Sequence, residues 1–224
     1  MDWEPIKPLI AKVEVSSKPG NQPVSVTFIP EELEVIGIGT DAVVVRHHSF
    51  PTIAFKVYVE EEIDTCQDEY EVYQRLQGSS FFPTCYDRDH RVLVLSYEEG
   101  LTLYDCLVQG IPIPETVLEE VAEARRYIKE IGLNPRDMHL KNVLLQEGHA
   151  KVLDVSEYNQ PGDDGRWDHL VQGYELFYSF LEGRRIPVWL IERVKGAYLD
   201  QIGEEFSLVE FGRSFLQFFS PSKR

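Results

Sequence analysis

The chain has 224 residues with 43% hydrophobic and 27% charged content, which suits one soluble domain or two small lobes. Its formal net charge of -16 argues against a nucleic-acid partner and against an anionic membrane surface, because both require clustered Lys and Arg. With three cysteines, no signal peptide and no apolar stretch of membrane-spanning length, we expect a cytoplasmic protein with free thiols.

The first part of the chain is predicted to be rich in strands. Residues 1–23 carry four prolines and a Pro-Gly-Asn turn signal, so we expect an irregular N-terminal extension there. Apolar runs bounded by turn signals predict strands at 24–28, 33–36, 43–46, 53–58, 84–88 and 91–96. Over 60–77, apolar residues recur every three or four positions, which predicts an amphipathic helix that Gly78 ends.

The second part of the chain is predicted to be mostly helical. The expected elements are helices at 102–108 and 115–131, a loop at 133–142, strands at 143–146 and 150–153, and further helices from 166 onward. The aromatic segment 205–219 predicts a helix that docks on the rest of this part, with a partner-binding helix as the alternative.

The most informative pattern lies between residues 134 and 154. Asn142 follows Asp137 by five residues, and Asp154 comes after the short predicted hairpin. Carboxylate and amide oxygens are the ligands that Mg²⁺ prefers, so Asn142 and Asp154 are candidate metal ligands. Asp137 can orient a hydroxyl group and accept its proton, and Lys141 can neutralise charge on a transferred phosphoryl group. The pattern therefore predicts phosphoryl transfer.

Arg136-Asp137 with Asn142, followed by Asp154, resembles the H-R-D-x-x-x-x-N and D-F-G pattern of the protein-kinase superfamily. The spacing of Asp137, His139 and Asn142 is also similar to that of the aminoglycoside phosphotransferase branch. The resemblance implies ATP and Mg²⁺ as cofactors, with Asp137 as the catalytic base. It implies a hydroxyl group on a protein or a small molecule as the acceptor, without saying which.

Two upstream features fit the same resemblance. Residues 36–44 match the family's glycine-rich loop, and 53–56 match its strand-lysine motif. The implied partner of that lysine is Glu69, with Glu71 as the alternative. The resemblance implies a set of ATP-binding residues that comprises Gly37, Gly39, Val44, Ala54, Lys56, Glu69, Tyr97 and Leu144. In that set, Tyr97 belongs to the hinge, and Val44, Ala54 and Leu144 surround the adenine ring.

The implied fold is α+β, namely a protein-kinase-like two-lobed fold. Its domain would cover 24–224, with a small antiparallel-sheet N-lobe at 24–98 that includes the helix at 60–77, and a truncated helical C-lobe at 99–224. The segment 167–173 resembles the helix start D-V-W-S-L-G of the family, which implies that Asp168 braces the catalytic loop.

The sequence departs from the family pattern where a peptide substrate is normally held. Pro135 replaces the usual His, Val155 replaces the Phe of D-F-G, and Ala42 replaces the third loop glycine. Only 14 positions (168 − 154) separate Asp154 from Asp168, so a full activation loop is missing. The overall pattern resembles that of the short serine/threonine kinases of Bacillus-type bacteria, the YrzF-like group.

Three functions fit these residues. The leading hypothesis is an active ATP-dependent kinase that phosphorylates a Ser or Thr hydroxyl. The second is a pseudokinase or slow ATPase that acts as a nucleotide-dependent binding module, which the short segment after Asp154 motivates. The third is a small-molecule kinase, which His139 and the missing peptide platform motivate.

Overall fold

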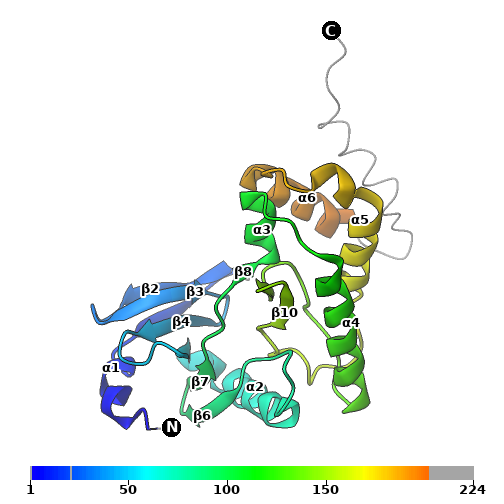
Figure 1. Ribbon diagram of the computed structural model, residues 1–224. Helices are drawn as coiled ribbons and strands as arrows, with labels where there is room; N and C mark the ends of the chain where they lie inside the picture. Colours follow the sequence, from blue (N-terminus) through cyan, green and yellow to red (C-terminus); the bar gives the residue numbers. More distant parts are fainter. Residues whose placement is uncertain (1, 21, 202–224) are drawn as a thin grey trace.

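The computed structural model describes residues 2–20 and 22–201, arranged in two parts (Figure 1). A sheet and helix α2 (Ile63–Leu76) form the small part, and α3 (Leu103–Gln109), α4 (Glu115–Glu130), α5 (Arg166–Leu181) and α6 (Val188–Gln201) form the helical part. Strands β8 (Leu101–Thr102), β9 (Val143–Gln146) and β10 (His149–Val152) lie at their junction. The predicted α+β class, with a small antiparallel-sheet lobe beside helices, is confirmed.

The main sheet of the small part has five antiparallel strands. Their spatial order is β3 (Leu33–Ile38), β4 (Ala42–His47), β5 (Ile53–Tyr58), β7 (Val92–Ser96) and β6 (Cys85–Asp89). Side chains alternate across a strand, so Phe55 and Val57 pack into the apolar cluster on one face of the sheet. Ala54 and Lys56 consequently face the other side, where helix α2 lies.

Helix α2 follows a single 3-10 turn, η2 (Glu60–Glu62), so the helix predicted over 60–77 is confirmed. Its buried residues fall three or four positions apart and comprise Cys66, Glu69, Val72, Tyr73 and Leu76. Gly78 follows with φ +85°, a left-handed conformation that ends the helix at little cost for glycine. The helix thereby presents Glu69 and Tyr73 to the junction between the two parts.

The N-terminal segment has regular structure, so the prediction of an irregular extension over 1–23 is wrong for its described residues. It contains η1 (Glu4–Ile6), α1 (Lys7–Ile10) and β1 (Glu14–Lys18), and β1 pairs antiparallel with β2 (Gln22–Phe28). Trp3 is 2% exposed, its ring centroid lies 5.7 Å from that of Phe55, and its Nε1 donates to Asp87 Oδ2 at 2.8 Å. The segment therefore covers one face of the main sheet.

The prolines misled the prediction because of where they lie. Pro5 and Pro8 stand in the first turns of η1 and α1, where the missing backbone N–H of proline leaves no intrahelical bond unmade. Ile6, Ile10 and Val13 supply the apolar surface that fixes the segment to the sheet. Packing against the main sheet therefore determines the structure of this segment, in spite of the prolines that locally favour a loop.

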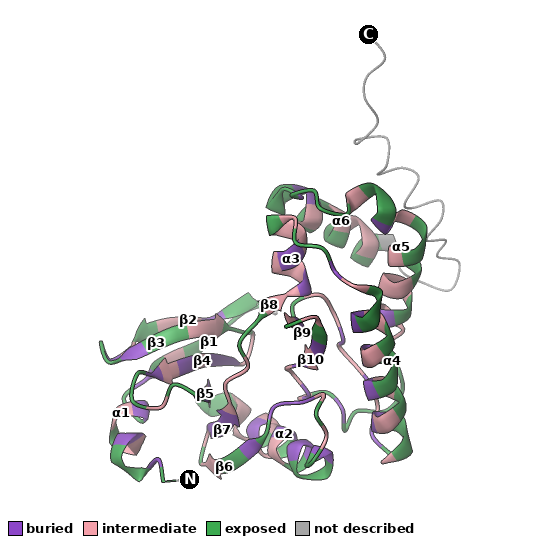
Figure 2. Cartoon of the chain, viewed as in Figure 1, coloured by how far each residue is buried: buried purple, intermediate pink, exposed green. Residues whose placement is uncertain are grey.

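The helical part follows the predicted order closely. Helices α4 and α5 occupy most of 115–131 and the stretch from 166, and β9 and β10 form the predicted hairpin. The buried stripe of α4 consists of Val117, Val121, Ala124 and Ile128, and it faces inward in Figure 2. The predicted helix at 205–219 lies outside the described residues.

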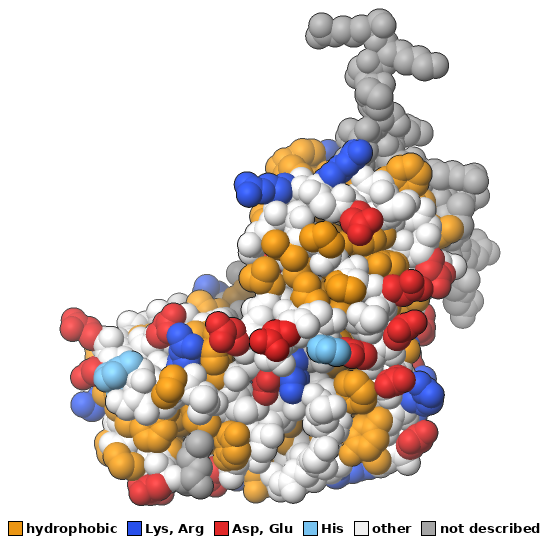
Figure 3. Space-filling model, viewed as in Figure 1, with side chains coloured by type: hydrophobic (Ala, Val, Ile, Leu, Met, Phe, Trp, Pro, Cys, Tyr) orange, Lys and Arg blue, Asp and Glu red, His pale blue; other side chains and the backbone are white. Residues whose placement is uncertain are grey.

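Charged side chains are spread over both parts of the molecule. Figure 3 shows acidic groups across the whole face in view, with hydrophobic side chains between them. The largest exposed apolar side chains on the helical part include Phe180 and Trp189, which are 55% and 61% exposed. Among the described helices, none is both long and apolar enough to cross a membrane.

Candidate active site

A buried ion pair joins the main sheet to helix α2. Lys56 Nζ lies 2.7 Å from Glu69 Oε2, and the two side chains are 12% and 0% exposed. Glu71, the alternative partner in the sequence, is exposed and accepts a hydrogen bond from Gln67 instead. Burial alone would lower the pKa of Lys56, but the carboxylates of Asp154 and Glu69 outweigh it and raise that pKa. The lysine is therefore held as a cation.

Asp154 lies two residues after the end of β10, close to the same lysine. Its Oδ2 is 3.4 Å from Lys56 Nζ, and its Oδ1 accepts a hydrogen bond from Ser156 N at 3.1 Å. Burial acts to raise the pKa of Asp154, but Lys56 and the Ser156 N–H outweigh it and hold that pKa below its usual value. The hydroxyl of Tyr73, on α2, donates to the carbonyl of Leu153 at 2.6 Å. Helix α2 thus contacts both the lysine and the segment that carries Asp154.

The loop at 133–142 is tied to the same segment by backbone hydrogen bonds. Asn142 Nδ2 donates to the carbonyl of Asp137 at 3.0 Å, and Leu153 N donates to the carbonyl of Asn142 at 2.9 Å. Asp137 has φ +50°, a left-handed conformation that is uncommon for a residue other than glycine. Asp164 Oδ2 accepts the backbone N–H of Asp137 at 2.9 Å, which helps to hold this conformation.

The carboxylate of Asp137 contacts two side chains. Arg166 Nη1, at the start of α5, donates to its Oδ1, and His139 Nε2 lies 3.6 Å from its Oδ2. Burial raises the pKa of Asp137 to about 6, while Arg166 opposes that rise. Burial also lowers the pKa of His139 to about 4, and the charges of Lys195, Arg166 and Lys141 act in the same direction. His139 is therefore neutral near pH 7.

The residue that braces the predicted catalytic loop is Asp164, so the prediction that Asp168 does so is wrong. Asp168 instead pairs with Arg125 of helix α4. Asp164 accepts from the backbone of Asp137, and its Oδ1 accepts from the backbone N of Arg166. The sequence reasoning also missed Arg166 itself, because an arginine in the first turn of a helix carries no spacing signal that would place it beside Asp137.

Lys141 is engaged on another side of the loop. Its Nζ lies 4.5 Å from the ring centroid of Tyr104 and 3.9 Å from Glu192 Oε1 on α6, and its side chain is 52% exposed. These neighbours differ from those of Asp137. The structure therefore brings Arg166, rather than Lys141, into contact with the predicted base.

The other predicted ATP-binding residues lie in the small part, in the segment around residue 97 that follows it, and in β9. Gly37 and Gly39 lie at the β3–β4 hairpin, where Gly39 N donates to the carbonyl of Ala42 at 2.9 Å. Ala54 and Leu144 are buried and Val44 is half-buried. In the predicted hinge, Tyr97 N donates to Thr52 O at 2.8 Å, so this backbone N–H is already occupied.

A divalent metal ion fits the oxygen atoms at the junction. Asn142 uses Nδ2 for the Asp137 carbonyl, which leaves its side-chain oxygen as an acceptor beside the segment that ends at Asp154. One carboxylate and one amide oxygen suit Mg²⁺, which takes its remaining ligands from phosphate and water. Within residues 2–20 and 22–201, no group of three or more His, Cys, Asp or Glu side chains is arranged to hold a metal ion by itself.

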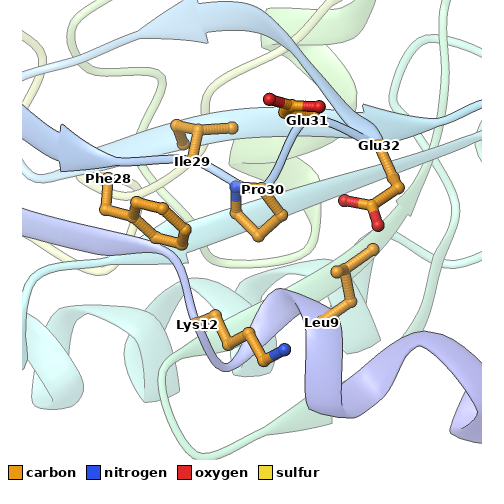
Figure 4. Close-up of a pocket in the computed structure, with 7 residues that line it drawn as sticks. All are labelled: Leu9, Lys12, Phe28, Ile29, Pro30, Glu31 and Glu32. Atoms are coloured by element: carbon orange, nitrogen blue, oxygen red, sulfur yellow. The ribbon is translucent and has the colours of Figure 1, made fainter.

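A cavity of about 330 Å³ lies elsewhere in the molecule. Figure 4 shows it between the N-terminal segment and the connection from β2 to β3, lined by Leu9, Lys12, Phe28, Ile29, Pro30, Glu31 and Glu32. None of these residues belongs to the segments that carry Lys56, Asp137 or Asp154. The cavity and the candidate active site are therefore separate.

Comparison with known proteins gives the following relatives. No protein-family model matches the chain. It is 33% identical over 171 residues to the "Putative serine/threonine-protein kinase YrzF" of Bacillus subtilis (strain 168), which covers 75% of this chain and 80% of that protein. It is 27% identical over 135 residues to the "Probable serine/threonine-protein kinase fnkB" of Dictyostelium discoideum, covering 55% of this chain and 25% of that protein. It is 35% identical over 66 residues to the human "Testis-specific serine/threonine-protein kinase 3", which covers 28% of this chain and 25% of that protein.

Proposed function

The chain belongs to the protein-kinase-like superfamily, and from that premise we propose that it is an ATP-dependent phosphotransferase that phosphorylates a serine or threonine hydroxyl group. The observation that carries the proposal is the meeting of three segments at one junction. Lys56 lies beside both Glu69 and Asp154, while Asp137 and Asn142 are hydrogen-bonded to each other in the adjoining loop. The names of the relatives support the kinase class and the serine/threonine acceptor.

We call Lys56, Glu69, Tyr73 and Asp154 the nucleotide side of the site. Lys56 would bind the phosphates of ATP, with Glu69 fixing its position, and the glycines of the β3–β4 hairpin would lie over them. Ala54, Val44 and Leu144 would pack on the adenine ring. Since Tyr97 N is occupied by Thr52, the base would have to bond to other backbone groups of the hinge.

Mg²⁺ would be held by Asn142 and Asp154, where it would neutralise the charge of the transferred phosphoryl group. The chain's own residues account for the remaining requirements. Asp137 would accept the proton of the attacking hydroxyl, and its pKa of about 6 leaves it largely deprotonated at neutral pH. Lys141 would add positive charge only after leaving Tyr104 and Glu192.

A nucleotide-dependent binding module is the second candidate, and one observation favours it. The guanidinium of Arg166 occupies Asp137 in this structure, which would slow proton transfer to that carboxylate. A module of this kind would bind Mg·ATP without transferring phosphate. A small-molecule kinase is a third candidate, since only 10 positions (164 − 154) separate Asp154 from the bracing Asp164.

The proposal is tested by following labelled γ-phosphate from ATP to the chain itself and to a mixture of serine and threonine peptides. We expect Mg²⁺-dependent transfer by the wild type, and a loss of about 10²- to 10⁴-fold in Asp137→Asn, which is the usual contribution of a general base. Nucleotide binding measured by calorimetry should be unchanged in that variant. Full transfer by Asp137→Asn would refute the assignment of the base, and nucleotide binding without transfer would favour the module.

A further inference from the structure

Cations gather around the predicted base, although the chain carries 38 acidic and only 22 basic residues. Arg166 contacts the carboxylate of Asp137, and the charges of Lys195 and Lys141 act on the neighbouring His139. We call Asp137, His139, Arg166 and Lys195 the acceptor side of the site.

Arg166 is paired with Asp137 and Asp164, and Lys141 lies near Glu192. Lys195, by contrast, forms no ion pair among residues 2–20 and 22–201. A cation without a carboxylate partner near the predicted base can bind an anion there.

We propose that the acceptor carries an anionic group, a carboxylate or a phosphate, close to its hydroxyl, and that Arg166 and Lys195 bind this group. The inference rests on the proposed phosphotransferase function and names the class of its acceptor. The anion has two sources, an acidic side chain next to a serine in a peptide, or a phosphate ester on a small hydroxyl compound. Both present the same chemistry to the arginine.

The guanidinium of Arg166 still has capacity to bind an anion. Nη1 donates to Asp137, and Nε lies 3.5 Å from Asp164 Oδ2. The third nitrogen, Nη2, contacts no hydrogen-bond partner among residues 2–20 and 22–201, and the side chain is 41% exposed. An arginine fork binds carboxylates and phosphates through two parallel N–H groups, so this open edge suits either anion.

Lys195 adds a second cation from a different element. It is exposed on helix α6, and its charge, together with those of Arg166 and Lys141, lowers the pKa of His139. Helix α6 is placed beside the loop by Glu192, whose Oε1 accepts the hydroxyl of Tyr104 at 3.0 Å and lies 3.9 Å from Lys141 Nζ. The anion would therefore be bound between the start of α5 and α6.

Binding of an anion by Arg166 also explains how Asp137 becomes available as a base. An acceptor anion competes with Asp137 for the guanidinium, so the carboxylate loses its ion pair when the acceptor binds. In the transfer step, the hydroxyl oxygen forms a bond to the γ-phosphorus while the bond from that phosphorus to the β,γ-bridging oxygen breaks. The hydroxyl proton goes to Asp137, and ADP leaves with the bridging oxygen.

The test measures equilibrium binding in the presence of Mg²⁺ and a non-hydrolysable ATP analogue, so it does not depend on turnover. One arm compares a serine peptide flanked by glutamates with the same peptide flanked by glutamines. The other arm compares glycerol 3-phosphate with glycerol. In at least one arm we expect the anionic member to bind about tenfold or more tightly than the neutral one, as charge-assisted hydrogen bonds require.

Variants identify the residues involved. Arg166→Gln should remove most of the preference, and Lys195→Gln, which alters an exposed residue of α6, should reduce it about threefold or more. Lys18→Gln removes an equal charge from an exposed position of β1 and should leave the preference unchanged. Affinity for the nucleotide should be the same in all three variants.

Several results would overturn the inference. These are equal binding of the anionic and neutral members in both arms, no binding in either arm, and a preference that survives in the Arg166→Gln, Lys195→Gln double variant. A weaker affinity of Arg166→Gln for the nucleotide, with the preference intact, would assign the arginine to ATP instead. Binding with the expected preference but without phosphate transfer would refute the proposed function and leave this inference standing.

Discussion

The nucleotide side and the acceptor side of the site differ in how their charges are held. On the nucleotide side, Lys56 is 12% exposed, Glu69 is fully buried, and their ion pair is supported by Asp154. On the acceptor side, Arg166 is 41% exposed and Asp137 is 32% exposed. A buried pair is costly to separate, whereas an exposed one exchanges partners readily. We therefore expect the Lys56–Glu69 pair to be in place before any ligand binds, whereas Asp154, which is 38% exposed, and the acceptor side can rearrange.

The sharpest contrast between the two sides should appear in folding stability. Glu69→Ala removes the buried partner of Lys56 and leaves Asp154 as its neighbouring carboxylate, so the variant should lose about 1.5–3 kcal/mol of unfolding free energy, the usual worth of a hydrogen bond to a charged group. Arg166→Gln breaks a partly exposed pair and should cost less than about 1 kcal/mol. Urea denaturation of both variants measures the difference. Equal losses in the two variants would mean that the two sides are built alike.

A smaller contrast concerns two tyrosine hydroxyls. Tyr73→Phe removes a buried donor and leaves the Leu153 carbonyl unpaired, which should cost about 1–3 kcal/mol. Tyr104→Phe removes an exposed bond to Glu192 and should cost about 0.5 kcal/mol or less. The same denaturation experiment checks both. If the Tyr104 variant proves the less stable of the two, the role given to Tyr73 in tying α2 to the Asp154 segment is wrong.

The acceptor side should also show in the pH dependence of transfer. The folded-state pKa of Asp137 is raised to about 6, and a base must be deprotonated to accept a proton. The value of kcat/KM for transfer, which reports the free enzyme, should therefore fall below about pH 6, about tenfold for each further pH unit. Because Arg166 opposes the rise in this pKa, Arg166→Gln should move the fall to higher pH. A wild-type profile that stays flat down to pH 5 would contradict the assignment of Asp137.

The smallest effect is expected for Lys141. Its ammonium group lies against Tyr104 and Glu192 in an exposed pair, so Lys141→Gln should reduce transfer by less than about fivefold. Steady-state kinetics with a fixed acceptor would measure this. A loss of a hundredfold would show that Lys141 leaves these neighbours and reaches the transferred phosphate, as the sequence pattern implies.

The sequence predicts the secondary structure and the nucleotide side better than the acceptor side. The strands and helices follow from apolar periodicity, and the neighbours of Lys56 follow from motifs that lie in fixed register on adjacent elements. The sequence did not predict the contacts of Arg166 and Asp164 with Asp137. These contacts depend on where the first turn of helix α5 lies relative to the loop, which no local sequence pattern encodes. The structure of the N-terminal segment was not predicted for a similar reason, because Trp3 packs against Phe55, which is distant in the sequence.

The most direct test of the central claim is the thermal unfolding midpoint with and without Mg·ATP, compared between the wild type and Asp154→Ala. At about a hundred times the dissociation constant, binding adds about 2.7 kcal/mol, which raises the midpoint by roughly 5–10 °C for a chain of this size. We expect that shift in the wild type, with its Mg²⁺-dependent portion lost in Asp154→Ala. No shift in the wild type at saturating nucleotide, or an equal Mg²⁺-dependent shift in both proteins, would contradict the account.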